Sequence, residues 1–147
     1  MVPNTSRYVL AYLLWAVSVA LAFVMLLTWR SSAMIALGVT QWDRYLEHAI
    51  NQFGFLFLAI FGLIVIVFTE YFYRTGVEQR RLFTRFFLIT FLELIMVTLA
   101  HLVRWVGAIL LNLPADPLFV VGEVALCGIA FWLYRRARQQ ERPLAVD

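Results

Sequence analysis

Four long apolar segments alternate with short polar segments along the chain. They cover residues 8–29, 53–73, 86–103 and 118–134, and Glu70, Glu93 and Glu123 are the only charged residues inside them. A helix rises about 1.5 Å per residue, so the first segment, residues 8–29, is long enough to cross a hydrocarbon core of about 30 Å. In lipid, backbone polar groups must be satisfied within the segment, which favours helices over strands. The pattern predicts an all-α integral membrane bundle of four transmembrane helices, forming a single domain over residues 1–147.

The connections between these segments are less uniform than the segments themselves. Residues 31–47 contain an apolar stripe at roughly helical spacing, which includes Met34, Leu37 and Leu46. This stripe fits either a helix lying in the membrane interface or an irregular loop. Between the third and fourth segments, Pro114 and Pro117 cannot continue a helix and therefore predict a turn.

Composition excludes most other classes of protein. Hydrophobic residues make up 63% of the chain and charged residues only 14%, and the mean hydropathy is +0.83. These values do not fit a disordered tail, a disulfide scaffold or an ordinary water-soluble enzyme. The chain has no glycine-rich nucleotide-binding loop, no metalloprotease motif and, with Cys127 as the single cysteine, no zinc-type cysteine cluster. We therefore expect no enzymatic activity, no catalytic residue and no metal site.

The distribution of arginines predicts an orientation in the membrane. The chain contains no lysine, and nine of its 12 basic residues lie before the first segment, between the second and third, or after the fourth. The positive-inside rule places these regions, and so both termini, in the cytoplasm. Arginines arranged in this way do not indicate a nucleic-acid partner, so the expected surroundings are a lipid bilayer and other membrane protein subunits. The expected location is a bacterial cytoplasmic membrane.

Two histidines offer a candidate cofactor site. His48 precedes the second segment and His101 ends the third, so both should lie near the outer face. Imidazoles on neighbouring helices can bind haem b or a chlorin from opposite sides, and Arg104 could pair with a propionate. The simpler interpretation is that no cofactor binds and both histidines are polar residues of the interface.

Two acidic residues inside the apolar segments are the other candidates. Glu93 lies near mid-membrane, where an ionised carboxylate is costly and should face protein, water or a partner. It could hold a neighbouring helix or take part in proton or quinone chemistry. Glu123 is shallower, and could reach water or meet Arg104 across the bundle. Small residues at helical spacing, including Gly54 with Gly62 and Gly122 with Gly128, suggest close helix contacts.

One stretch resembles a known family. The chain reads FTEYFYR over residues 68–74 and RRLFTRFF over residues 80–87, followed by a third helix and a short basic tail. This arrangement resembles the phosphate-starvation-inducible E family of small four-helix membrane proteins. The family typically has an arginine within its third helix and an acid shortly after it, whereas the corresponding stretch here reads TFLELIMVT over residues 90–98. The resemblance implies a fold and little about activity.

Together these features predict a non-catalytic accessory or scaffold subunit of a multisubunit membrane complex, such as a respiratory or photosynthetic electron-transfer complex. One alternative is a haem- or chlorin-binding membrane subunit that uses His48 and His101. Another is a small channel or proton-coupled carrier that uses Glu93.

Overall fold

The computed structural model describes residues 5–40, 43–114 and 117–141, and within these ranges it contains helices and no strand. The helices are α1 (Thr5–Thr40), α2 (Arg44–Glu78), α3 (Leu82–Leu110) and α4 (Leu118–Gln140). All four are long and apolar enough to cross a membrane. The prediction of an all-α chain with four helices able to span a membrane is therefore confirmed.

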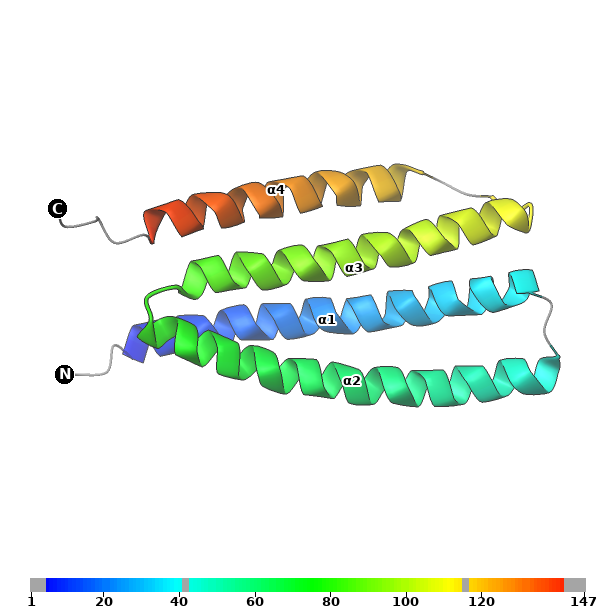
Figure 1. The fold of residues 1–147 in the computed structure, drawn as a ribbon, viewed down its shortest axis with the longest axis horizontal. Helices are drawn as coiled ribbons and strands as arrows, with labels where there is room; N and C mark the ends of the chain where they lie inside the picture. The colour runs from blue at the N-terminus through cyan, green and yellow to red at the C-terminus, as the bar shows by residue number, and fades with distance from the viewer. Residues whose placement is uncertain (1–4, 41–42, 115–116, 142–147) are drawn as a thin grey trace.

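The helices lie side by side in the spatial order α4, α3, α1, α2 (Figure 1). The principal packing is between α1 and α3, between α3 and α4, and between α1 and α2, with a smaller contact between α2 and α3. Over the described ranges, α4 makes no close backbone approach to α1 or α2. The fold is thus an open row of helices, whereas a closed bundle would give each helix two neighbours.

The two ends of the row differ in composition. The end that carries Thr5 of α1 and Gln140 of α4, together with the α2–α3 connection, is called the terminal end (Figure 1). The other end, with Leu110 and Leu118, is called the opposite end. Most of the described arginines are on helix segments at the terminal end, as the sequence pattern predicted for one side of the membrane.

The helices extend beyond the predicted segments. Residues 31–40 continue α1 and α2 begins at Arg44, so neither a separate interfacial helix nor an irregular loop occupies residues 31–40. Those two interpretations of the connection were wrong. The serines do not interrupt α1, because the hydroxyl of Ser31 bonds to the carbonyl of Thr28 within the helix and Ser32 is buried against α3. Helix α1 has 36 residues and is therefore about 54 Å long, well beyond the hydrocarbon thickness.

Small side chains bring α1 and α3 close together. The buried residues of α1 are Ala11, Ser18, Ala22 and Ser32, and those of α3 include Glu93, Ala100 and Gly107 at seven-residue intervals. Ser32 donates a hydrogen bond to the carbonyl of Ala100 at 2.7 Å, directly across the contact. A seven-residue repeat of small residues allows neighbouring membrane helices to pack along their length.

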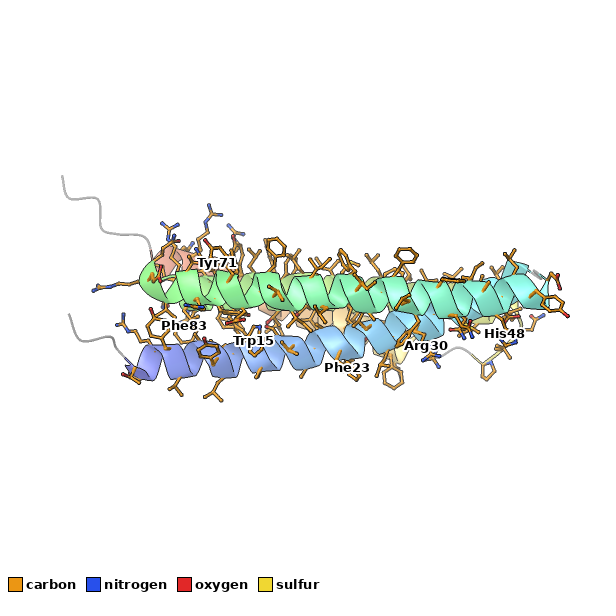
Figure 2. All side chains as sticks on the ribbon, turned by 90° about the horizontal axis from the view of Figure 1, so that it is seen from below. Trp15, Phe23, Arg30, His48, Tyr71 and Phe83 are labelled. Atoms are coloured by element: carbon orange, nitrogen blue, oxygen red, sulfur yellow. The ribbon has the colours of Figure 1, made fainter. Side chains whose placement is uncertain are left out.

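Helix α2 joins this pair through aromatic residues near the terminal end. Tyr73 is 1% exposed, and its hydroxyl lies 2.8 Å from the hydroxyl of Ser18 on α1. Trp15 donates its indole hydrogen to the carbonyl of Ile66, 3.3 Å away. The contact to Ile66 gives the indole N–H of Trp15 a partner inside the apolar segment. Away from such contacts, side chains such as Phe23 and Tyr71 extend outward and remain exposed (Figure 2).

Two of the helices end in the same type of cap. At the end of α2, the backbone N–H of Arg81 bonds to the carbonyl of Gly76 and that of Arg80 to Val77. At the end of α3, Leu113 bonds to Ala108 and Asn112 to Ile109 in the same way. This is the Schellman arrangement, which requires one residue in the left-handed region. Arg80 and Asn112 occupy that position, both with φ of 55°. Of the predicted turn that follows α3, Ala115 and Asp116 lie outside the described residues.

Helix α4 contacts the rest of the protein along one narrow stripe. Its less exposed positions recur at helical spacing and are Val120, Glu123, Cys127, Ala130, Leu133, Tyr134 and Ala137. This spacing defines one helix face, which packs on α3. The remaining surface of α4, with Leu118, Val121 and Trp132 among its large exposed residues, has no covering element in the described chain.

Candidate functional site

The sharpest polar contact in the described chain joins α3 to α4. Nδ1 of His101 lies 2.6 Å from Oε1 of Glu123, and the two side chains are 25% and 15% exposed. His101 is placed by α3, nine residues before its end, and Glu123 lies on the narrow stripe of α4. Sequence analysis singled out both residues but expected Glu123 to reach water or Arg104. The structure pairs it with His101 instead.

A cavity of about 370 Å³ adjoins this pair near the opposite end of the row. One side of the cavity is a stripe of α3 at positions i, i+3, i+4 and i+7, formed by His101, Arg104, Trp105 and Ala108. The other side comes from the region around the start of α4, and is formed by Pro114, Phe119 and Val120. Its volume falls in the range of sites that hold small molecules.

The groups around this cavity combine charge with aromatic surface. Within the described ranges, His101 is the only basic side chain that lies within 4 Å of a carboxylate, so Arg104 has no such partner. With Nδ1 of His101 held by Glu123, its Nε2 is the ring nitrogen left for another partner. Trp105 and Phe119 add aromatic rings. The arrangement suits a flat ligand with a polar or anionic edge.

The second histidine is not part of this arrangement. His48 is an exposed residue near the start of α2 (Figure 2). It lies at the same end of the row as the cavity, the end that carries Leu110 and Leu118, but on a different helix. His101 faces α4, and α4 has no close approach to α2 in the described ranges. His48 does not line the cavity. The structure therefore brings together His101, Arg104 and Glu123, and leaves His48 apart from them.

The mid-membrane acid belongs to a different part of the molecule. Glu93 is 7% exposed and lies seven residues before Ala100 on the stripe of α3 that packs against α1. Its Oε2 and the hydroxyl of Thr90 are buried without a hydrogen-bond partner among the described residues. Arg104, three turns further along α3, is exposed and lines the cavity, whereas Glu93 does not. Glu93 is therefore a buried acidic residue of the helix packing, and it does not line the cavity.

Sequence analysis missed Trp105 and Phe119 as members of the site. The position of Trp105 four residues after His101 was a usable signal for a shared helix face. No comparable signal exists for Phe119, because its place depends on how α4 packs on α3. Among the described residues, no group of three or more His, Cys, Asp or Glu could hold a metal ion.

Comparison of the chain with protein-family models, with curated proteins and with solved structures finds no match. The resemblance to the phosphate-starvation-inducible E family therefore stays a prediction. What the molecule does must be argued from its own geometry.

Proposed function

We propose that the protein is a non-catalytic accessory subunit of a larger membrane assembly in a bacterial cytoplasmic membrane. The observation that carries this proposal is the open row of helices, in which α4 has α3 as its single described neighbour. A four-helix membrane protein that functions alone can close its bundle, so that each helix packs on two others. Here a further membrane helix could pack on α4 without displacing any existing contact.

The uncovered surface of α4 has features that favour association in lipid. Apolar side chains gain little by moving from lipid to protein, so membrane helices associate through small residues and polar groups. A Cβ atom built at Gly122 or Gly128 would meet nothing within 4 Å, and Ala125 between them is also exposed. By contrast, Gly62 and Gly107 are close to Leu26 and Ile35 inside the protein. Small residues thus occur in two places. Some lie in contacts between the helices of this chain, and those on the exposed surface of α4 take part in no such contact.

The test is purification of the full chain in a mild detergent, followed by identification of co-purifying polypeptides and the mass of the complex. We expect stable partners for the natural sequence and their loss in the double variant Gly122→Leu with Gly128→Leu. Gly54→Leu on α2 is the matched control, since a Cβ at Gly54 also meets nothing within 4 Å. A monomer that co-purifies with no other chain would contradict the proposal. Detection of haem, chlorin or electron-transfer subunits among the partners would identify the assembly as an electron-transfer complex.

Both termini of the subunit lie in the cytoplasm under this proposal. Support comes from the concentration of arginines at the terminal end, since cytoplasmic regions carry an excess of basic residues. In a Cys127→Ser background, Gln140→Cys should react only with reagents that reach the cytoplasm, and Glu47→Cys only with external reagents. The reverse labelling pattern would contradict the proposed orientation.

The His101–Glu123 pair favours a second candidate, a subunit that binds a ring-shaped cofactor such as haem b or a chlorin. A histidine that binds a metal commonly has its other ring nitrogen held by a carboxylate, as Nδ1 of His101 is held here. One axial histidine would then replace the pair predicted from the sequence. An absorption band of the bound ring that is lost in His101→Leu and kept in His48→Leu would support this candidate. The lack of any such band in the chain purified with its natural lipids would remove it.

A further inference from the structure

A second cavity, of about 380 Å³, opens at the terminal end where α2, α3 and α4 come together. The guanidinium groups of Arg81, Arg85 and Arg138 line it, and Glu141 contributes the single carboxylate. The lining therefore has a net charge of +2. Among the residues that the structure describes, none of these arginines has a carboxylate within 4 Å. Three unpaired cations around one cavity are costly to keep together unless an anion is present.

Arg85 is held in a fixed position in this cavity. Its Nη1 donates to the carbonyl of Phe72 at 2.5 Å and its Nη2 donates to Oε1 of Gln79 at 2.6 Å. Its guanidinium also stacks over the ring of Phe72, 4.4 Å from the centroid. A guanidinium has five N–H donors, so this fixed group keeps further donors for another acceptor. A pre-positioned guanidinium suits an oxyanion such as phosphate.

A hydrogen bond beside this cavity links α3 to the residue that follows α4. The hydroxyl of Thr84, near the start of α3, donates to Oε2 of Glu141, just after α4. This contact gives one oxygen of the Glu141 carboxylate a hydrogen-bond donor, and Arg138 lines the same cavity as Gln79 and Arg81 of the α2–α3 connection. Phe72, Leu88 and Tyr134 form the apolar part of the lining. The site therefore offers cations to a head group and apolar surface to the chain attached to it.

We propose that this cavity binds the phosphate group of an anionic phospholipid from the leaflet at the terminal end. A soluble phosphate could satisfy the three arginines, but it would make no use of the apolar lining or of the position at the ends of membrane-spanning helices. Basic pockets between membrane helices are a known type of binding site for anionic head groups. Binding here would join α2, α3 and α4, and α4 otherwise has contact with α3 alone.

The test is native mass spectrometry of the full chain with phosphatidylglycerol and with phosphatidylcholine, in the presence and absence of inorganic phosphate. We expect preferential retention of phosphatidylglycerol, with affinity about five-fold weaker in Arg138→Gln, the effect of removing one cation near the membrane surface. Arg85→Gln should weaken retention at least as much. Arg136→Gln is the matched control, because it removes the same charge from α4 at a residue outside the cavity.

Four results would overturn the proposal. Equal retention of the two lipids would show that there is no anion site. Equal losses in Arg136→Gln and Arg138→Gln would show a general surface charge effect. Displacement of the lipid by millimolar inorganic phosphate would assign the site to a soluble anion. Since Arg85→Gln also removes contacts to α2, a loss of lipid in that variant alone, with Arg138→Gln unchanged, would be a folding effect and would contradict the site.

Discussion

Nδ1 of His101 and Oε1 of Glu123 are 2.6 Å apart across the contact between α3 and α4. In the described ranges no other basic side chain lies within 4 Å of a carboxylate, and the pair lies on the one face of α4 that touches the protein. Together with the contact of Thr98 to Cys127 and the hydrogen bond from Thr84 to Glu141, the pair fixes where α4 sits along α3. Oε2 of Glu123 is buried without a partner among the described residues, so the carboxylate depends on His101.

The first prediction concerns this pair. His101→Leu or Glu123→Leu alone should lower the free energy of unfolding by about 1–3 kcal/mol, since each leaves a buried polar group unsatisfied. The double variant should recover most of that loss, because two apolar side chains then meet in an apolar setting. The measurement is a double-mutant cycle of unfolding in detergent micelles, with an expected coupling of about 0.6–2 kcal/mol.

Val124→Leu serves as the control for this cycle. Val124 is 57% exposed on α4, so its substitution should change stability by less than about 0.5 kcal/mol. Additive losses in the double variant, with no recovery, would show that His101 and Glu123 stabilise the protein independently of each other.

The sequence indicated this site only in part. His101, Arg104 and Glu123 were all identified, because charged and imidazole groups are rare inside apolar segments and must have a reason to be there. Their pairing could not be derived, since it depends on the register between α3 and α4, and the segment that connects these helices carries no information on register. The separation of His48 from His101 could not be predicted either, because it depends on α1 lying between α2 and α3.

The second prediction concerns the contact between α1 and α3. A Cβ atom at Gly107 would lie 2.7 Å from Cγ2 of Ile35, and a β-branched side chain in a helix has little freedom to move away. Gly107→Ala should therefore destabilise the protein by about 1–3 kcal/mol. Gly54→Ala makes the same change where nothing lies within 4 Å, and should be neutral or stabilising by up to about 1 kcal/mol. Equal effects of the two variants on the unfolding midpoint would disprove this close packing.

The third prediction concerns the cap of α2. Arg80 has φ of 55°, a conformation that is costly for most residues and that glycine adopts freely. Arg80→Gly should stabilise the protein by about 0.5–1 kcal/mol. Asn112→Gly at the matching cap of α3 should gain less, because asparagine tolerates this conformation better than arginine. The free energies of unfolding of the two variants test whether Arg80→Gly gains more stability than Asn112→Gly. A loss of stability in Arg80→Gly would mean that the arginine side chain stabilises the protein by more than its backbone strain costs.

The fold, like the site, was predicted from the sequence only in part. Four apolar segments were enough to predict four helices, since lipid allows few alternatives for the backbone. The ends of α1 and α2 were misjudged, because hydropathy reports where lipid ends and carries little information on where a helix ends. The row arrangement was not predicted, because an apolar face looks the same in sequence whether it meets lipid or another helix.

The fourth prediction concerns Glu93, which is 7% exposed between α1 and α3 and whose Oε2 has no hydrogen-bond partner in the described ranges. Placing a carboxyl group in this apolar contact costs free energy that an apolar side chain of similar length would not. Glu93→Met should therefore raise the free energy of unfolding by about 2 kcal/mol, and Glu93→Gln should have a smaller effect because its amide is also polar. The measurement is reversible unfolding of the purified chain in detergent.

Glu78→Gln is the control, because Glu78 is exposed at the end of α2 and its substitution should leave stability within about 0.5 kcal/mol. A loss of stability in Glu93→Met would show that the carboxyl group has a partner, and Thr90, whose hydroxyl is also buried without one, would be the first residue to test. A gain in stability has a consequence for function. A residue that lowers the stability of the α1–α3 contact is not there to hold the two helices together. If the Glu93→Met chain is stable but no longer assembles or functions, Glu93 has a role beyond the fold.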